Sequence, residues 1–260
     1  MERQNPDFSR YALQALLFVT LAVAAQANAT QEGGRDELNE ASITGPFIMH
    51  PAAKMAAEIA VEHTAPRSLD RAIWTQDREL TSMLLSAGAD PNGISSGNKK
   101  PFIIIAAMQG DPHIIRLLLS HGANINVDGD SGDALYWAAR QGNLQATQFL
   151  IKHGADVTAI AADGSTALHM TLGHDNDVRV AEALLDAGAD IEARQGEMTP
   201  LMQAALFGRT EWVELFIKHG ANINATTSSM ATAFSISSTF GRNQEIEDML
   251  LKAGADQTSR

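Results

Sequence analysis

The stretch LIKHGAD at residues 150–156 recurs along the chain at nearly constant intervals. Its pattern is two apolar residues, two variable residues, glycine, alanine and then aspartate or asparagine. The other copies read LLSAGAD at 84–90, LLSHGAN at 118–124, LLDAGAD at 184–190, FIKHGAN at 216–222 and LLKAGAD at 250–256. The six glycines, Gly88, Gly122, Gly154, Gly188, Gly220 and Gly254, are separated by 34, 32, 34, 32 and 34 residues. A period of this length indicates an array of stacked units, none of which buries its own apolar face alone.

Each period contains the pattern of two short helices. The first helix carries a pair of alanines that lets a neighbouring helix approach closely, and the second carries an apolar run such as Leu117–Leu119 that ends at the glycine of the tag. The alanine pairs are Ala106–Ala107, Ala138–Ala139 and Ala204–Ala205, and the glycines expected to end the first helix are Gly110, Gly142, Gly208 and Gly241. Polar, glycine-containing segments between the periods are expected to be turns.

The openings of the periods resemble the T-P-L-H-x-A signature of ankyrin repeats. The signature is clearest in TALHM at 166–170 and TPLMQA at 199–204, and weaker in PFIIIAA from Pro101, DALYWAA at 133–139 and TAFS at 232–235. The resemblance implies an all-α ankyrin-repeat solenoid with projecting finger turns. It also implies a protein-protein interaction module with no enzymatic activity and no cofactor. We expect six copies, at residues 67–99, 100–131, 132–164, 165–197, 198–230 and 231–260.

The residues before the array predict an exported protein. ALLFVTLAVAA at 15–25 follows Arg3 and Arg10 and precedes overlapping A-x-A sites, which is typical of a cleaved signal peptide over residues 1–29. The run is too short to cross a bilayer as a helix. We expect a flexible linker at 30–50 and a capping helix at 51–66, where Pro51 suits a first helical position. The bacterial periplasm is the expected compartment; with a eukaryotic source, Asn224-Ala225-Thr226 would instead form a glycosylation sequon.

Composition restricts the class of partner. The formal net charge of −12 disfavours nucleic acid and anionic membranes and favours a protein partner with a basic surface. The absence of cysteine excludes disulfides and thiolate chemistry and is compatible with an oxidising compartment. We expect a monomer that binds another protein. Neutralising a toxin, assisting peroxide defence and acting on a host as an effector remain open roles.

No catalytic or metal-binding motif stands out among the titratable residues. His121, His153 and His219 occupy the same place before the Gly-Ala of three tags, where a cation suits a helix C-terminus. The resemblance implies a hydrogen-bonded structural role for His169. We therefore predict no catalytic, cofactor-binding or metal-binding residues.

The candidate protein-binding residues follow from the resemblance. In ankyrin proteins the two residues after the alanine pair face the concave side and vary with the ligand. These are Met108 and Gln109, Arg140 and Gln141, and Leu206 and Phe207, with Phe240 equivalent in the last copy. Tyr136 is added because it replaces the family's histidine. Trp137 and Trp212, by contrast, are interpreted as core residues.

Overall fold

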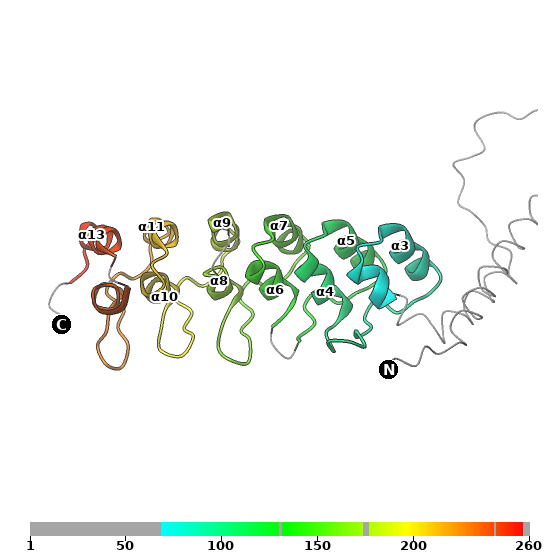
Figure 1. Cartoon of the computed structure of the whole chain (residues 1–260), viewed down its shortest axis with the longest axis horizontal. Helices are drawn as coiled ribbons and strands as arrows, with labels where there is room; N and C mark the ends of the chain where they lie inside the picture. Colours follow the sequence, from blue (N-terminus) through cyan, green and yellow to red (C-terminus); the bar gives the residue numbers. More distant parts are fainter. Residues whose placement is uncertain (1–68, 130–131, 174–176, 242, 257–260) are drawn as a thin grey trace, which may run out of the picture.

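Two rows of short helices lie side by side along the molecule (Figure 1). The computed structural model describes residues 69–129, 132–173, 177–241 and 243–256. The inner row contains residues 69–74, α4 (Phe102–Gln109), α6 (Ala134–Arg140), α8 (Ala167–Met170), α10 (Pro200–Leu206) and α12 (Ala233–Ile236), which continues into the π-helical η2 (Ser237–Gly241). The outer row contains α3 (Arg78–Ser86), α5 (Pro112–Ser120), α7 (Leu144–Lys152), α9 (Val178–Asp186), α11 (Thr210–Lys218) and α13 (Gln244–Lys252). The predicted all-α solenoid is confirmed.

Polar side chains begin most of these helices. Asp111 accepts a hydrogen bond from the backbone N–H of His113, and Asp133 accepts one from Tyr136, at 2.9 and 2.8 Å. Thr199 caps α10 in the same way and is followed by Pro200 at the first helical position. Such caps satisfy backbone N–H groups that have no partner inside the helix. A short helix of seven to nine residues therefore starts at a defined place.

The six tags end the six outer helices with the same backbone motif. In each, the alanine N–H donates to the carbonyl of the first tag residue, five positions back, and the glycine N–H donates to the carbonyl of the second, as in Ala123 to Leu118 and Gly122 to Leu119. All six glycines have positive φ, between 80° and 98°, which only glycine adopts readily. The predicted termination of the second helix by the tag is confirmed.

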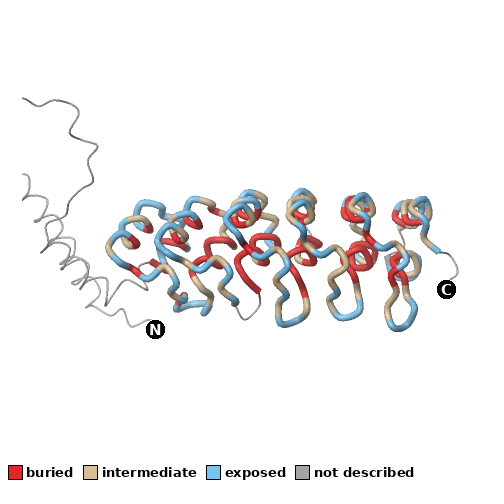
Figure 2. The backbone as a smooth tube through the Cα atoms, turned by 180° about the vertical axis from the view of Figure 1, so that it is seen from behind, coloured by how far each residue is buried: buried red, intermediate tan, exposed pale blue. Residues whose placement is uncertain are grey.

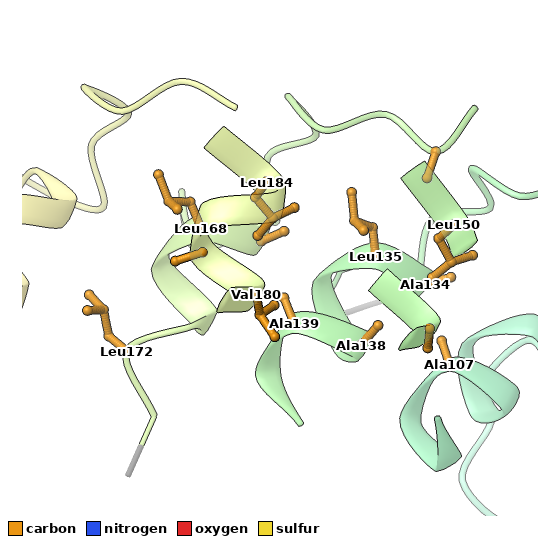
Figure 3. Packing of buried hydrophobic residues seen from close by; sticks show 14 of the residues in the cluster. Ala107, Ala134, Leu135, Ala138, Ala139, Leu150, Leu168, Leu172, Val180 and Leu184 are labelled. Carbon is orange, nitrogen blue, oxygen red and sulfur yellow. The ribbon is translucent and has the colours of Figure 1, made fainter. Parts of the chain in front are cut away.

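The core runs between the rows from one end of the array to the other. The first apolar residue of each tag from the second copy onward is fully buried, and these residues are Leu118, Leu150, Leu184, Phe216 and Leu250. The alanine pairs of α4, α6 and α10 are also fully buried. Figure 3 shows Ala107 of α4 near Ala134 and Ala138 of α6 in this packed layer. Each copy thus buries its apolar face against its neighbours.

The fourth copy lacks the alanine pair, and a tryptophan side chain contacts one of the residues that replace it. Thr171 and Leu172 stand where the other copies have alanines, directly after the four-residue helix α8. Trp212 of α11 reaches this position, and its indole N–H donates to the Thr171 hydroxyl at 3.1 Å. Trp212 is 6% exposed, which confirms its interpretation as a core residue.

The segments between copies project as fingers on the side of the inner row (Figures 1 and 2). Isolated antiparallel bridges pair Ile94 with Pro101, Ile160 with Thr166 and Gln195 with Met198, and no longer strand occurs within the described ranges. Among the described helices, none is both long and apolar enough to cross a membrane. The expected signal peptide (1–29), linker (30–50) and capping helix (51–66) lie outside the described residues.

Candidate functional site

The finger side of the inner row is the candidate binding face, because the packing between copies does not bury most of its side chains. We call the last residues of the inner helices, together with the finger turns that precede these helices, the finger face. Side chains connect its two parts: Gln203 of α10 donates to Gln195 of the finger before it at 2.9 Å, and Lys100 at the base of another finger lies over Trp137 of α6. A partner docking here therefore meets fingers and helix ends together.

Seven of the eight predicted contact residues are accessible on this face. Phe207, the C-cap of α10, is 55% exposed, and Phe240 in η2 is 70% exposed. Arg140 and Gln141 at the end of α6 are exposed, whereas Met108, Gln109 and Leu206 are half-buried. The expectation that Phe207 presents an apolar surface therefore agrees with its position.

Tyr136 is misplaced in the predicted set, because it is only 7% exposed. Its ring lies against Gly132, where a Cβ atom would come within 2.5 Å of the Tyr136 ring, and its hydroxyl is 3.4 Å from the Ser165 hydroxyl of the next finger. A buried ring that fills the space beside a glycine has no surface to offer a partner. Tyr136 supports the fingers instead.

Trp74 belongs to the finger face and was missed by the sequence analysis. It is 41% exposed at the end of helix 69–74, the position that Met108 occupies in α4. The first copy lacks the alanine pair from which the contact positions were counted. Counting back from the tag finds it: Trp74 precedes Gly88 by 14 residues, as Met108 precedes Gly122.

Trp137 is only partly the core residue that the sequence predicted: its side chain packs against the core but is not fully buried. The side chain is half-buried, and two cations lie over its ring. The Lys100 ammonium nitrogen is 4.2 Å and the Arg140 guanidinium carbon 4.9 Å from the ring centroid. Cations are attracted to the negative face of an aromatic ring. Trp137 therefore joins one finger, α6 and Arg140 into a single surface.

Hydrogen bonds join neighbouring fingers in the C-terminal half of the array. Gln195 donates to the Asp163 carboxylate at 2.9 Å, and Ser228 donates to Glu197 through both its backbone N–H and its hydroxyl. Hydrogen bonds from Ser165, and to a smaller extent from Gln195, hold the pKa of the Asp163 carboxyl below its ordinary value, and those from Ser228 do the same for Glu197. The two side chains are therefore ionised at neutral pH and fixed before a partner arrives, which lowers the ordering cost of binding.

Four histidines have structural positions. Nδ1 of His121, His153 and His219 lies 2.9, 2.7 and 3.0 Å from the carbonyl one turn back in its own helix, at the helix C-terminus. His169 is 3% exposed and holds Thr166 through Nδ1, so its predicted hydrogen-bonded role is confirmed. Within the described residues no group of three potential ligands could hold a metal ion.

A hollow of about 520 Å³ lies on the other side of the molecule, between α3 and α5. Its lining includes Met83, His113 and Arg116. Arg78, also in the lining, donates to the Asp111 carboxylate at 2.8 Å and so ties the two helices together. The hollow lies between two outer helices, and none of the predicted contact residues lines it.

Comparison with known proteins connects this geometry to a family. The family model described as ankyrin repeats (3 copies) matches residues 69–161, 130–195 and 168–260. The chain is 31% identical over 210 residues to the ankyrin repeat and KH domain-containing protein mask-1 of Caenorhabditis elegans, covering 68% of this chain and 8% of that protein. It is 48% identical over 54 residues to the human ankyrin repeat and KH domain-containing protein 1, covering 21% of this chain and 2% of that protein. The chain thus spans less than a tenth of the length of these relatives.

Proposed function

The chain belongs to the ankyrin-repeat family, and on that premise we propose that it binds a partner protein through its finger face. The observation that carries the proposal is the row of exposed aromatic side chains at inner-helix ends, Trp74, Phe207 and Phe240. None of the three is needed to bury the core between copies. Large apolar side chains exposed to water near the ends of successive inner helices are typical of an interaction surface.

The energetics of interfaces favour these residues as anchors. Binding energy concentrates in a few side chains, commonly Trp, Tyr and Arg, while surrounding contacts contribute little. Trp74 and Arg140 are of those types, and Phe207 adds an apolar ring beside the half-buried Leu206. Because the fingers are already braced, a partner does not need to order them.

We further propose that the protein acts after export. The apolar run at 15–25 with its A-x-A sites supports secretion, with the periplasm as the compartment. A basic toxin protein is the partner that the formal charge of −12 supports, because opposite net charges speed association. N-terminal sequencing of the mature protein tests the export proposal: a chain that begins near Asn28 or Thr30 supports it, and a full-length chain in the cytosol contradicts it.

Replacing Phe207 tests the binding face. Phe207→Ala should weaken binding of the protein that co-purifies with the array by about 2 kcal/mol or more, because it removes an anchor. The thermal melting curve should hardly change, since the side chain is more than half exposed and lies outside the stacked core. Affinity is measured by titration calorimetry with the isolated partner.

Met83→Ala is the matched control, because Met83 is an apolar side chain 65% exposed on the outer row. We expect it to leave the affinity unchanged. Equal losses in the two variants would place the interface elsewhere. A large fall in the melting temperature of Phe207→Ala would instead assign that ring to the core.

A further inference from the structure

One place on the finger face, around Trp137, carries a local charge opposite in sign to that of the whole chain. Lys99 and Lys100 end the finger that precedes α4, and Arg140 ends α6. Lys100 and Arg140 each lie over the ring of Trp137. Acidic residues outnumber basic ones by 31 to 19 in the full sequence. A group of cations at one place on such a surface therefore needs an explanation.

Among the residues that the structure describes, these cations have no carboxylate partner. The ion pairs of the described residues join Arg78 to Asp111, Arg179 to Asp177, Lys218 to Glu182 and His219 to Asp186, and none includes Lys99, Lys100 or Arg140. For Lys100 and Arg140 the contact in the structure is the face of Trp137. A ring face attracts the charge but accepts none of the strong hydrogen bonds that a carboxylate accepts.

The geometry leaves both cations able to bind an anion. The Arg140 side chain is exposed, and a guanidinium lying over a ring still presents N–H groups at its edge. Lys100 is half-buried against the same ring. Contact with the ring therefore limits the rotamers that the two long side chains can adopt. Restricting the side chains beforehand reduces the entropy lost when a carboxylate arrives.

We propose that Lys100, Trp137 and Arg140 form the subsite that receives an acidic side chain from an extended segment of the partner protein. The proposal rests on the proposed function and specifies one contact within it. Two cations held by one ring suit the carboxylate of a short acidic segment, whereas nucleic acids and anionic bilayers are held by many such contacts and are repelled by the net charge of −12. A partner whose overall charge is positive can still present an acidic segment here.

Short labelled peptides test the subsite in the complete array. The probes are three fluorescein-labelled peptides of equal length that alternate alanine with glutamate, glutamine or lysine, followed by fluorescence anisotropy. We expect the glutamate peptide to bind most tightly. The double variant Lys100→Gln/Arg140→Gln should weaken its binding by about tenfold or more, because two charge-assisted contacts are lost. Lys152→Gln on the outer helix α7 is the matched control and should leave binding unchanged.

The tryptophan indole N–H signals in a nitrogen-proton correlation spectrum locate the contact. Addition of the glutamate peptide should move the Trp137 signal, identified by its loss in Trp137→Phe. The Trp212 signal should stay in place, because that indole is buried against Thr171. Movement of the Trp212 signal alone, or no preference for glutamate over glutamine and lysine, would overturn the proposal.

Two further outcomes separate this proposal from its alternatives. If the double variant only lowers the melting temperature and binds the glutamate peptide as the parent does, the cations brace the finger and the proposal fails. If vesicles containing phosphatidylserine or a single-stranded oligonucleotide bind more tightly than the glutamate peptide and lose that binding in the double variant, the acidic-peptide proposal also fails. In either case, reduced partner affinity in Phe207→Ala would show that the proposed function still stands.

Discussion

The roles of residues that require a particular backbone conformation or hydrogen bond could be predicted from the sequence. The tag glycines and His169 are such residues, and the structure places them as expected. Tyr136 and Trp137 were misjudged because exposure depends on what packs beside a side chain: Gly132 makes room for the tyrosine ring, and Lys100 arrives from a finger to cover Trp137. Neither neighbour is evident from the repeat pattern.

His169 should make the free energy of unfolding depend on pH. Burial lowers the pKa of His169 below its ordinary value of 6.5, although Asp163 and Asp190 oppose the shift. At pH values below about 6.5 the unfolded chain therefore binds more protons at this residue than the folded chain does. The part of the free energy of unfolding that depends on His169 is fully present above about pH 6.5, and it is lost as the pH falls from there to the pKa of His169 in the folded state.

Urea unfolding at a series of pH values measures this loss. We expect the dependence between about pH 7 and pH 5 to be shallower in His169→Gln than in the parent. His121→Gln is the control, since His121 is exposed at a helix end and should leave the dependence in place. An unchanged slope in His169→Gln would assign the pH dependence to other groups.

At the scale of the elements, asparagines four residues after the tag glycine connect successive copies. Asn126 accepts a hydrogen bond from the Asp156 backbone N–H at 3.0 Å and donates to the Gly154 carbonyl at 3.3 Å. Asn92 and Asn224 make the same pair of bonds to the copies that follow them. Thr158 holds the equivalent position in the third copy, and its backbone N–H and hydroxyl donate to Asp156 of its own copy.

Asn126→Ala should therefore lower the free energy of unfolding by about 1–2 kcal/mol, because two bonds between copies are removed. Thr158→Ala serves as the control and should change it by about 0.5 kcal/mol or less, as ordinary surface substitutions do. Urea melts followed by circular dichroism provide both numbers. If the two variants lost equal stability, the asparagine bonds would not contribute to coupling between copies.

At the scale of the whole molecule, the period predicted a stacked array, and the resemblance to ankyrin repeats predicted its all-α architecture. Near-constant spacing fixes helix pairs of similar length, and apolar faces on both sides of each pair require stacking. The distribution of charge over the finger face was not predictable, because Lys100 of one copy comes to lie over the ring of Trp137 in the next copy only after stacking. The net charge of −12 therefore gave no sign of the basic patch at Trp137.

Hydrogen-deuterium exchange of the array, free and bound to its co-purifying partner, tests the finger face most directly. Finger and inner-helix amides exchange through local openings that a docked partner suppresses. We expect slowed exchange at residues 92–100 and 192–198 and at the ends of α6 and α10, with α5, α7 and α11 unchanged. Protection confined to the outer helices, with the fingers exchanging as in the free protein, would contradict binding through the finger face.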